Sequence, residues 1–416
     1  MTTPYPLPLP PNMHIKSISL QNYRNYIDSS FEFSPEGSLI IGKNGSGKTN
    51  LLEAISYFTY GKSILNHLDL QLINHGKDSF FVKSCFQKNT NCSNDFTAVD
   101  SSKSSNGFPA VDLSNNIQAM TEFKAYYNSQ KKKVLHIDQK PLNKLSDLYQ
   151  HLQVVYSGPD DIFNIFSVPA RRRTFLDMAI SKIYPVYIDY LRRFKETLAQ
   201  RNSLLKKDFS KKEKEAWDRT FCEDAKNVVD IRLRFFEVYR SYFKEAYAMI
   251  MDINENVDIF LKLNVSTSSL HTLHYQSRMD YSSVERGGKG EYNQDFISYM
   301  LSILHENTEK EKKYQTSLFG PHLDDFIVSI YQKNAILFAS QGQKRSLVVA
   351  LKVALANMIT DINNILPIMI FDDTLAELDK QRCENLLKNL TGKHQIFIAS
   401  PTRDRYLELN LPVMLL

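Results

Sequence analysis

Nine consecutive residues near the N-terminus have the types and spacing of a phosphate-binding loop. They read Gly42-Lys43-Asn44-Gly45-Ser46-Gly47-Lys48-Thr49-Asn50, and the first eight fit G-x-x-x-x-G-K-[ST] without deviation. The glycines let the backbone curl so that successive N–H groups point at phosphate oxygens, and the following helix adds its positive N-terminal end. We therefore expect Lys48 to reach the β- and γ-phosphates of a nucleotide and the Thr49 hydroxyl to bind Mg²⁺.

Two aspartates far along the chain could complete this site. Ile365 to Phe371 is a short apolar run, expected to form a buried strand, and Asp372 and Asp373 follow it directly. Asp372 is predicted to hold Mg²⁺, which is the Walker B role, and Asp373 to polarise the attacking water. The predicted catalytic residues are therefore Lys48, Asp372 and Asp373, with ATP and Mg²⁺ as cofactors. The alternative is a pair of solvated acids at the end of a strand.

A second anion site is expected where Ser340-Gln341-Gly342-Gln343 precedes a long helical pattern. The N–H groups and the dipole of a helix start favour an anion there. Two anion sites on one chain suggest an ABC-type arrangement, in which one nucleotide is gripped between the loop of one molecule and the S-x-G-Q turn of another. An ordinary helix cap is the alternative. The segment Thr374 to Asp379 then stands where ABC-type ATPases carry their D-loop, and Asp379 could equally cap a helix.

The elements that must position these residues alternate between strand and helix at both ends of the chain. Ser38 to Ile41 reads as a strand, the run from Thr49 as a helix, and Gln395 to Ala399 as another strand. Alternating patterns at 78–87 and 120–138 predict antiparallel strands. Residues 171–250 predict two long amphipathic helices with a polar break at 206–215, packed as an antiparallel arm.

Composition and charge narrow the class of protein. A chain of 416 residues, 43% hydrophobic, is too long for one ordinary domain, and its net charge of +5 permits nucleic-acid binding without establishing it. The four cysteines have no paired metal-ligand spacing, which indicates a reducing compartment. No run approaches the roughly 20 apolar residues that a bilayer span needs. We expect no membrane association and a cytoplasmic location.

Several segments resemble the RecF family over nearly the whole length from Met13. They are Leu20 to Tyr26, the phosphate loop, Ser157 to Asp161, Arg171 to Asp177, Leu198 to Lys206, Gly320 to Asp325, Ser340 to Arg345 and the Asp372 to Asp379 block. The arginine block, the Gln200-Arg201-Asn202 segment and the Gly320-Pro321-His322 segment are the specific ones. RecF proteins usually have Arg where Leu323 stands here, which puts any role of that guanidinium in doubt.

The resemblance implies a protein that forms a homodimer on ATP and hydrolyses it slowly, with stimulation by DNA. It also implies binding to double-stranded DNA and to gapped or junction structures, and work with RecO and RecR to load RecA. Basic clusters suit sequence-independent phosphate contacts, although a solvated helix face is the alternative. The candidates are Arg171, Arg172, Arg173, Arg192 and Arg193, with Lys206 and Lys207 beyond them. Arg24 is expected either to contact nucleotide phosphate or to form a structural ion pair.

The predicted fold is α/β, an ABC-type P-loop ATPase head with an inserted helical arm. The expected segments are a tail at 1–12, a head part at 13–170 with a Ser/Asn-rich insertion at 89–118, an arm at 171–314 and a second head part at 315–416. Two other functions stay open. One is a transporter-type ATP-binding subunit, and the other is a scaffold that binds ATP and hardly hydrolyses it.

Overall fold

The computed structural model describes residues 13–88, 120–142, 152–251, 255–264, 291–403, 406 and 411–416. The described chain divides into two compact units. The first unit comprises Met1–Tyr156, Asn364–Ala376 and Asn389–Leu416, and the second comprises Ser157–Asn363 and Glu377–Lys388. The predicted Ser/Asn-rich insertion and the predicted N-terminal tail lie outside the described residues.

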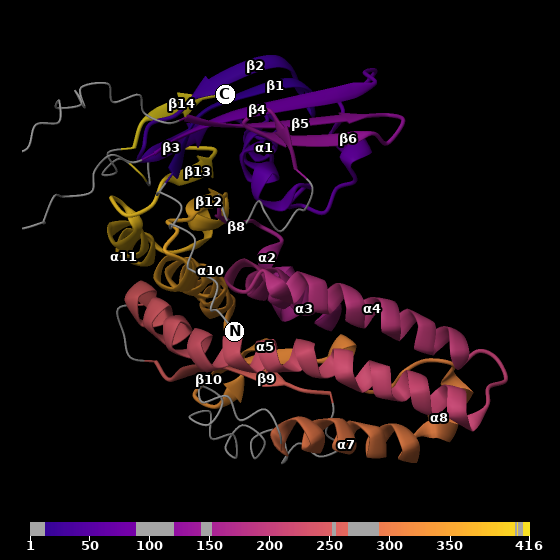
Figure 1. Ribbon diagram of the computed structural model, residues 1–416. Coiled ribbons are helices and arrows are strands. Elements are labelled where there is room, and N and C mark those ends of the chain that lie inside the picture. The colour runs from indigo at the N-terminus through magenta and orange to yellow at the C-terminus, as the bar shows by residue number, and fades with distance from the viewer. Residues whose placement is uncertain are drawn as a thin grey trace, which may run out of the picture. The chain divides into compact units, whose positions relative to one another are not determined.

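The first unit contains two sheets (Figure 1). One is antiparallel in the order β2-β1-β4-β5-β6-β7, and its strands are β1 (Met13–Tyr23), β2 (Tyr26–Glu32), β4 (Ser79–Lys88), β5 (Met120–Asn128), β6 (Lys133–Ile137) and β7 (Lys140–Pro141). The other has the order β14-β3-β13-β12-β8, and its strands are β3 (Gly37–Ile41), β8 (Val154–Ser157), β12 (Ile368–Asp372), β13 (Ile396–Ser400) and β14 (Val413–Leu415). The neighbours β12, β13, β3 and β14 are parallel, so β3 and β12 deliver their carboxyl ends to the same edge.

One helix belongs to the core of both sheets. Helix α1 (Lys48–Tyr60) is buried from Leu51 to Tyr60 without interruption. Its apolar residues form one cluster with residues of β1, β4, β5, β12 and β13. A helix that is buried all round is fixed by packing on every side, so the loop at its N-terminus has a rigid support. The short η1 (Asp69–Leu72) follows α1.

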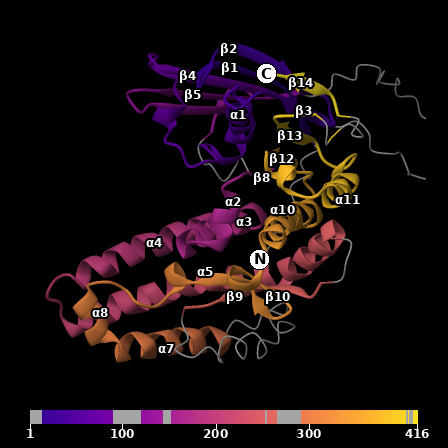
Figure 2. The ribbon, with the colours of Figure 1, turned by 180° about the vertical axis from the view of Figure 1, so that it is seen from behind.

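The second unit is mainly helical. Its helices are α2 (Asp161–Phe166), α3 (Pro169–Ile183), α4 (Val186–Leu204), α5 (Lys211–Met251), α7 (Glu291–Glu306), α8 (Thr308–Tyr314), α9 (Ala335–Phe338), α10 (Gln341–Asn363) and α11 (Lys380–Leu390). Helices α4 and α5 lie side by side and run antiparallel, joined by residues 205–210 (Figures 1 and 2). The predicted helical pair is confirmed, but the predicted polar break at 206–215 is shorter, because Lys211 to Glu215 already belong to α5. The stretch 171–205 is nevertheless two helices, because Pro185 cannot continue α3.

A small antiparallel sheet accompanies these helices. It has the order β11-β10-β9, formed by β9 (Val257–Lys262), β10 (Asp325–Ile330) and β11 (Lys333–Asn334). Two further 3₁₀ turns are η4 (Pro321–Leu323) and η5 (Thr374–Glu377). The sequence did not predict this sheet, because the stretch 260–292 shows no periodic pattern.

Helix α10 is the one described helix that is long and apolar enough to cross a membrane by length and composition. In its most apolar window 72% of the residues are buried inside the protein, so that apolarity serves packing. Helix α10 contacts α5, α2 and α3, which places the Ser340 segment in the same compact unit as the arm helices. The two compact units do not define the limits of an ATPase head. The predicted division of the chain into head and arm therefore stays a prediction.

Candidate nucleotide-binding site

The loop between β3 and α1 has the backbone of a phosphate cradle. Gly45 and Gly47 have φ values of 85° and 108°, in the left-handed region that favours glycine. A Cβ at Gly47 would lie 2.5 Å from Asn25 Nδ2 and 2.9 Å from the Tyr26 hydroxyl oxygen, so no larger residue fits without displacement. Position 47 therefore requires glycine for both its conformation and its surroundings.

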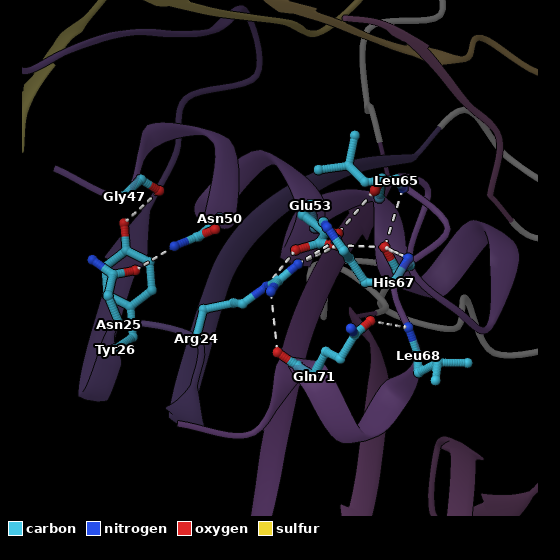
Figure 3. A network of polar contacts seen from close by, with 12 residues as sticks. Arg24, Asn25, Tyr26, Gly47, Asn50, Glu53, Leu65, His67, Leu68 and Gln71 are labelled. Carbon is cyan, nitrogen blue, oxygen red and sulfur yellow. Dashed lines mark hydrogen bonds and ion pairs between the residues drawn. The ribbon is translucent and has the colours of Figure 1, made fainter. Parts of the chain in front are cut away.

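The hairpin between β1 and β2 holds this loop in place (Figure 3). Asn25 Nδ2 donates to Ser46 O at 3.2 Å, and the Tyr26 hydroxyl donates to Gly47 O at 3.1 Å. Asn50 Nδ2 donates to Asn25 Oδ1 at 2.8 Å, which ties the start of α1 to the same hairpin. Sequence reasoning did not assign Asn25 and Tyr26 to the site, although both belong to the segment that resembles RecF.

Lys48 lies over its own loop. Its Nζ donates to Gly42 O at 2.7 Å and to Lys43 O at 3.2 Å, and the residue is 4% exposed. An ammonium has three N–H donors, so these two carbonyls leave one donor for a phosphate oxygen. The geometry thus suits the predicted role of Lys48 at the phosphates.

Asp372 is brought to the start of α1 by the parallel sheet. Thr49 Oγ1 donates to Asp372 Oδ1 at 3.2 Å, and the Tyr156 hydroxyl donates to Asp372 Oδ2 at 2.8 Å. Burial raises the pKa of Asp372 above its usual value, and the hydrogen bonds from Tyr156 and Thr49 oppose that rise. A hydroxyl and a carboxylate side by side are hard oxygen ligands of the kind that Mg²⁺ prefers.

The donor set fits a magnesium ion that shares its ligands with phosphate. Among the described residues no group of three or more His, Cys, Asp and Glu side chains could hold a metal. Mg²⁺ commonly takes one or two carboxylates from the protein and completes its shell with phosphate oxygens and water. Thr49 and Asp372 would therefore hold the ion in the presence of nucleotide, as the sequence predicts.

Three buried polar atoms in the two predicted motifs have no hydrogen-bond partner in the described structure. They are Ser46 Oγ in the loop, Asp373 Oδ1 and Thr374 Oγ1. Asp373 has a φ of 54°, and its N–H donates to Ala399 O at 3.2 Å, so its backbone is fixed in a left-handed turn. Buried polar groups are normally paired, and such exceptions are common at functional sites. Asp373 Oδ1 is thus a buried carboxylate oxygen without a hydrogen-bond partner among the described residues.

The Ser340 segment, in the second unit, begins α10 with a reciprocal cap. Ser340 N donates to Gln343 Oε1 at 3.0 Å, and Gln343 N donates to Ser340 Oγ at 3.2 Å. Ser340 and Gln341 are exposed, so the turn is open to solvent in the described chain. The helix-cap reading is thus confirmed, while contact with a nucleotide stays a prediction.

Two residues of the segment from Thr374 to Asp379, Glu377 and Asp379, have partners in the second unit. Arg382 N donates to Asp379 Oδ1 at 2.9 Å, so Asp379 caps α11. Glu377 forms an ion pair with Arg345, in which Nε and Oε2 are 3.1 Å apart. Both contacts lie within the second unit. Glu377 is therefore engaged by an arginine of α10.

Arg24 adopts the second of its two predicted roles, a structural ion pair (Figure 3). Its Nε donates to Glu53 Oε2 at 2.9 Å, and its Nη1 donates to Gln71 O at 3.1 Å. Glu53 is fully buried on α1 and also meets His67 Nδ1 at 3.0 Å and the Ser63 hydroxyl. A buried carboxylate needs such partners, and Arg24 supplies the cation.

The predicted DNA-contacting arginines have unequal environments. Arg172 is 5% exposed and makes a bidentate pair with Asp325 at 2.7 and 2.6 Å, so its assignment as a DNA contact is corrected to a structural role. Arg171 bonds Asn164 Oδ1 at 2.9 Å, and Arg173 Nη1 bonds Asp324 O at 3.3 Å. On α4, Arg192 pairs with Asp189 and Glu196, while Arg193 is exposed with no acidic partner shown in the described chain.

The segments most specific to the family resemblance form the polar interior of the second unit. Arg201 meets Glu311 at 2.6 Å, Asp218 at 2.8 Å and Ser317 Oγ at 2.7 Å. In a second cluster Arg232 bonds Asp324 at 2.8 Å, Asp177 at 2.9 Å, Pro321 O at 2.6 Å and the Tyr187 hydroxyl at 2.9 Å. The members of these clusters that belong to the resembling segments, Arg201, Asp177 and Asp324, are therefore structural.

Comparison with known proteins agrees with this geometry. Residues 14–412 match the family model described as RecF/RecN/SMC N terminal domain. The chain is 30% identical over 393 residues to the DNA replication and repair protein RecF of Exiguobacterium sp., covering 94% of this chain and 93% of that protein. It is 28% identical over 395 residues to the RecF protein of Prosthecochloris aestuarii, covering 93% of each.

A solved structure has a similar fold. The recombination mediator protein RecF in complex with ATPrS, from the RecFOR pathway, superimposes with a TM-score of 0.76 at 23% identity, covering 95% of this chain and 94% of that one. A structure of the recombination mediator protein RecF with ATP gives a TM-score of 0.75 at 24% identity. At this identity the likeness establishes the fold, which confirms the predicted ABC-type ATPase architecture.

Proposed function

This chain belongs to the RecF family, and on that premise we propose that it is an ATP-dependent DNA-binding protein of replication and recombinational repair. The observation that carries the proposal is the contact of Thr49 with Asp372 at 3.2 Å, beside Lys48 on a glycine loop. This arrangement is what a phosphate and its Mg²⁺ require. Family membership argues against the transporter-type subunit that the sequence left open.

The proposed cycle begins with ATP on the loop. Residues 42–50 cradle the phosphates. Thr49 and Asp372 would hold Mg²⁺, which would supply positive charge that stabilises the negative charge on the phosphates. The turn of Ser340, Gln341, Gly342 and Gln343 of a second copy closes over the same nucleotide, so that ATP drives homodimerisation. Asp373 orients the attacking water for slow hydrolysis. Loss of the γ-phosphate weakens the contact between the copies.

The proposed substrate of the dimer is DNA, bound through its phosphates without reading sequence. By family resemblance the structures held are duplex DNA and single-strand to double-strand junctions at gaps, and DNA stimulates a weak ATPase. RecR, RecO and RecA are the proposed partners on the same grounds. A relative with ATP bound belongs to the RecFOR pathway, which supports this assignment.

Phosphate release measured with and without DNA tests the function. We expect a slow release with MgATP that rises when gapped DNA is added and disappears in Lys48→Met. A second candidate, the scaffold that binds ATP without hydrolysing it, would give ATP binding and no release. The buried Oδ1 of Asp373 favours hydrolysis, because a buried carboxylate oxygen without a hydrogen-bond partner is an exception of the kind found at catalytic sites.

A further inference from the structure

Two arginines join the turn at the start of α10 to the segment that follows the Walker B acids. Arg345, on the first turns of α10, reaches Glu377 twice. Its Nε lies 3.1 Å from Glu377 Oε2, and its Nη1 donates to Glu377 O at 3.4 Å. Arg345 therefore contacts both the side chain and the backbone carbonyl of Glu377.

The second connection runs through a buried serine. Ser346, fully buried, donates from Oγ to Gly342 O at 3.2 Å, and it accepts from Arg382 Nη1 at 3.3 Å. Arg382 Nε lies 3.0 Å from Asp379 Oδ2, and Asp379 caps α11. The carbonyl of Gly342 in the predicted signature turn is thus linked through two side chains to Asp379.

Stability does not explain the Arg345–Glu377 pair. The two side chains are 39% and 36% exposed, and pairs in such positions add about 0–1 kcal/mol to folding. Glu377 is also four residues after Asp373, and the 3₁₀ turn η5 (Thr374–Glu377) spans the interval. Two residues of that turn, Thr374 and Leu375, are buried. The turn is therefore anchored by its first two residues, which follow Asp373 directly, while Glu377 at its end is held by Arg345.

The geometry points to a positioning role for Arg345 and Glu377. This inference rests on the proposed function and names a regulation of the same site. When the turn at Ser340 and Gly342 engages the nucleotide of a second copy, Arg345 draws Glu377 with it, and Glu377 sets the position of Asp373 in its own chain. Each molecule would thereby activate its own hydrolytic carboxylate only when it has closed on the nucleotide of its partner.

A double-mutant cycle tests this inference. The variants are Arg345→Gln, Glu377→Gln and the two combined, each measured for ATP affinity, melting temperature and single-turnover hydrolysis under dimer-forming conditions. We expect unchanged ATP affinity and melting temperature, and a hydrolysis rate about 2- to 30-fold lower in each single variant, the range of coupling seen in connected networks. The double variant should lose no more than either single one.

A matched control lies on α11. Glu384 makes an exposed pair with Lys380 at 3.4 Å and touches neither path, so Glu384→Gln should hydrolyse ATP at the wild-type rate. Wild-type rates in Arg345→Gln and Glu377→Gln would overturn the inference. Multiplicative losses in the double variant would also overturn it, because they would mean that Glu377 acts alone, for example as the catalytic acid. Failure of the unmodified protein to hydrolyse ATP or to dimerise would instead contradict the proposed function.

Discussion

Lys48 is the residue on which nucleotide binding depends most directly. Its ammonium is held by Gly42 O and Lys43 O with one donor left, so a phosphate can gain a charge-assisted hydrogen bond. Hydrogen bonds to charged groups contribute about 1.5–3 kcal/mol, which corresponds to about 10- to 150-fold in affinity. We predict that Lys48→Met binds ATP more weakly by that factor, as measured by nucleotide titration. The variant should also fail to dimerise with ATP, as measured by sedimentation. Wild-type affinity in a folded Lys48→Met protein would refute this role.

The two adjacent aspartates should have separable roles. Asp372 is 1% exposed and bonded to Thr49 and Tyr156, whereas Asp373 Oδ1 is without a partner. We predict that Asp373→Asn binds ATP and dimerises but hydrolyses ATP more slowly. The loss of rate should be at least about tenfold, a lower bound set below the typical general-base contribution of about 10²–10⁴-fold. Asp372→Asn should weaken the Mg²⁺-dependent part of binding.

The measurements are ATP affinity with and without Mg²⁺ and single-turnover hydrolysis for both variants. An Asp373→Asn protein that hydrolyses at the wild-type rate would remove Asp373 from the mechanism. Glu377 is the nearest other carboxylate after Asp373 in the sequence. Its ion pair with Arg345 makes it a poorer candidate for the catalytic acid.

At the residue scale, spacing predicted the types of contact and not all of the partners. The glycine pattern was sufficient for the loop, and the apolar run before Asp372 was sufficient for its burial. Tyr156, Asn25 and Tyr26 could not be found this way, because each reaches the site from another strand or turn. Arg172 shows the opposite limit, since a cationic triplet on a helix does not reveal which member faces inward toward Asp325.

At the scale of elements, the start of α10 combines a cap with a predicted contact to nucleotide. Ser340 Oγ accepts from Gln343 N, and aspartate caps helices as well as serine does. Ser340→Asp should therefore keep the fold while placing a negative charge against the phosphates of the partner's nucleotide. We predict normal ATP binding by the monomer and loss of ATP-driven dimerisation by light scattering. If Ser340→Asp forms as many dimers as the unmodified protein, the Ser340 turn does not contact the nucleotide of a second copy.

The helical arm should depend on its buried arginine. Arg201 is 1% exposed and pairs with Glu311, which is fully buried. Burial lowers the pKa of Arg201, whereas Glu311 and Asp218 raise it, and the pKa ends above its usual value. Removing one partner of such a cluster costs about 3–5 kcal/mol, because a buried charge is left unpaired. We predict that Arg201→Met lowers the free energy of unfolding, measured in urea, by that amount. On the same helix, Arg192→Met should cost about 0–1 kcal/mol, since Arg192 is exposed, and equal losses would contradict the structural role.

Periodicity predicted the long elements better than the short ones. The pair α4 and α5 and the strands β3, β12 and β13 carry strong apolar patterns, and all were predicted. The strand β2 has no buried residue after Tyr26, and β11 is two residues long, so neither leaves a pattern. The packing of α10 on α5 was equally invisible, because it depends on residues far apart in the chain.

At the scale of the whole molecule, DNA binding should be electrostatic. Affinity for duplex DNA should fall with salt, with a slope near −0.9 per phosphate contacted. Arg193 is the exposed arm arginine without an acidic partner shown in the described chain, so Arg193→Ala should lower the slope by about 1 for every sequence. Binding that ignores salt, or that changes for one sequence only, would contradict this prediction. The cytoplasmic location stays a prediction from sequence.

The central claim is that each nucleotide is shared between two copies, and a mixing experiment tests it most directly. Lys48→Met lacks a working loop and keeps the Ser340 turn, while Ser340→Asp lacks the turn and keeps the loop. Each variant alone should remain monomeric in MgATP by sedimentation. An equimolar mixture should form heterodimers that hold one nucleotide, because the loop of one variant and the turn of the other make one complete site. A mixture that stays as monomeric as its components, while the unmodified protein dimerises, would contradict the account.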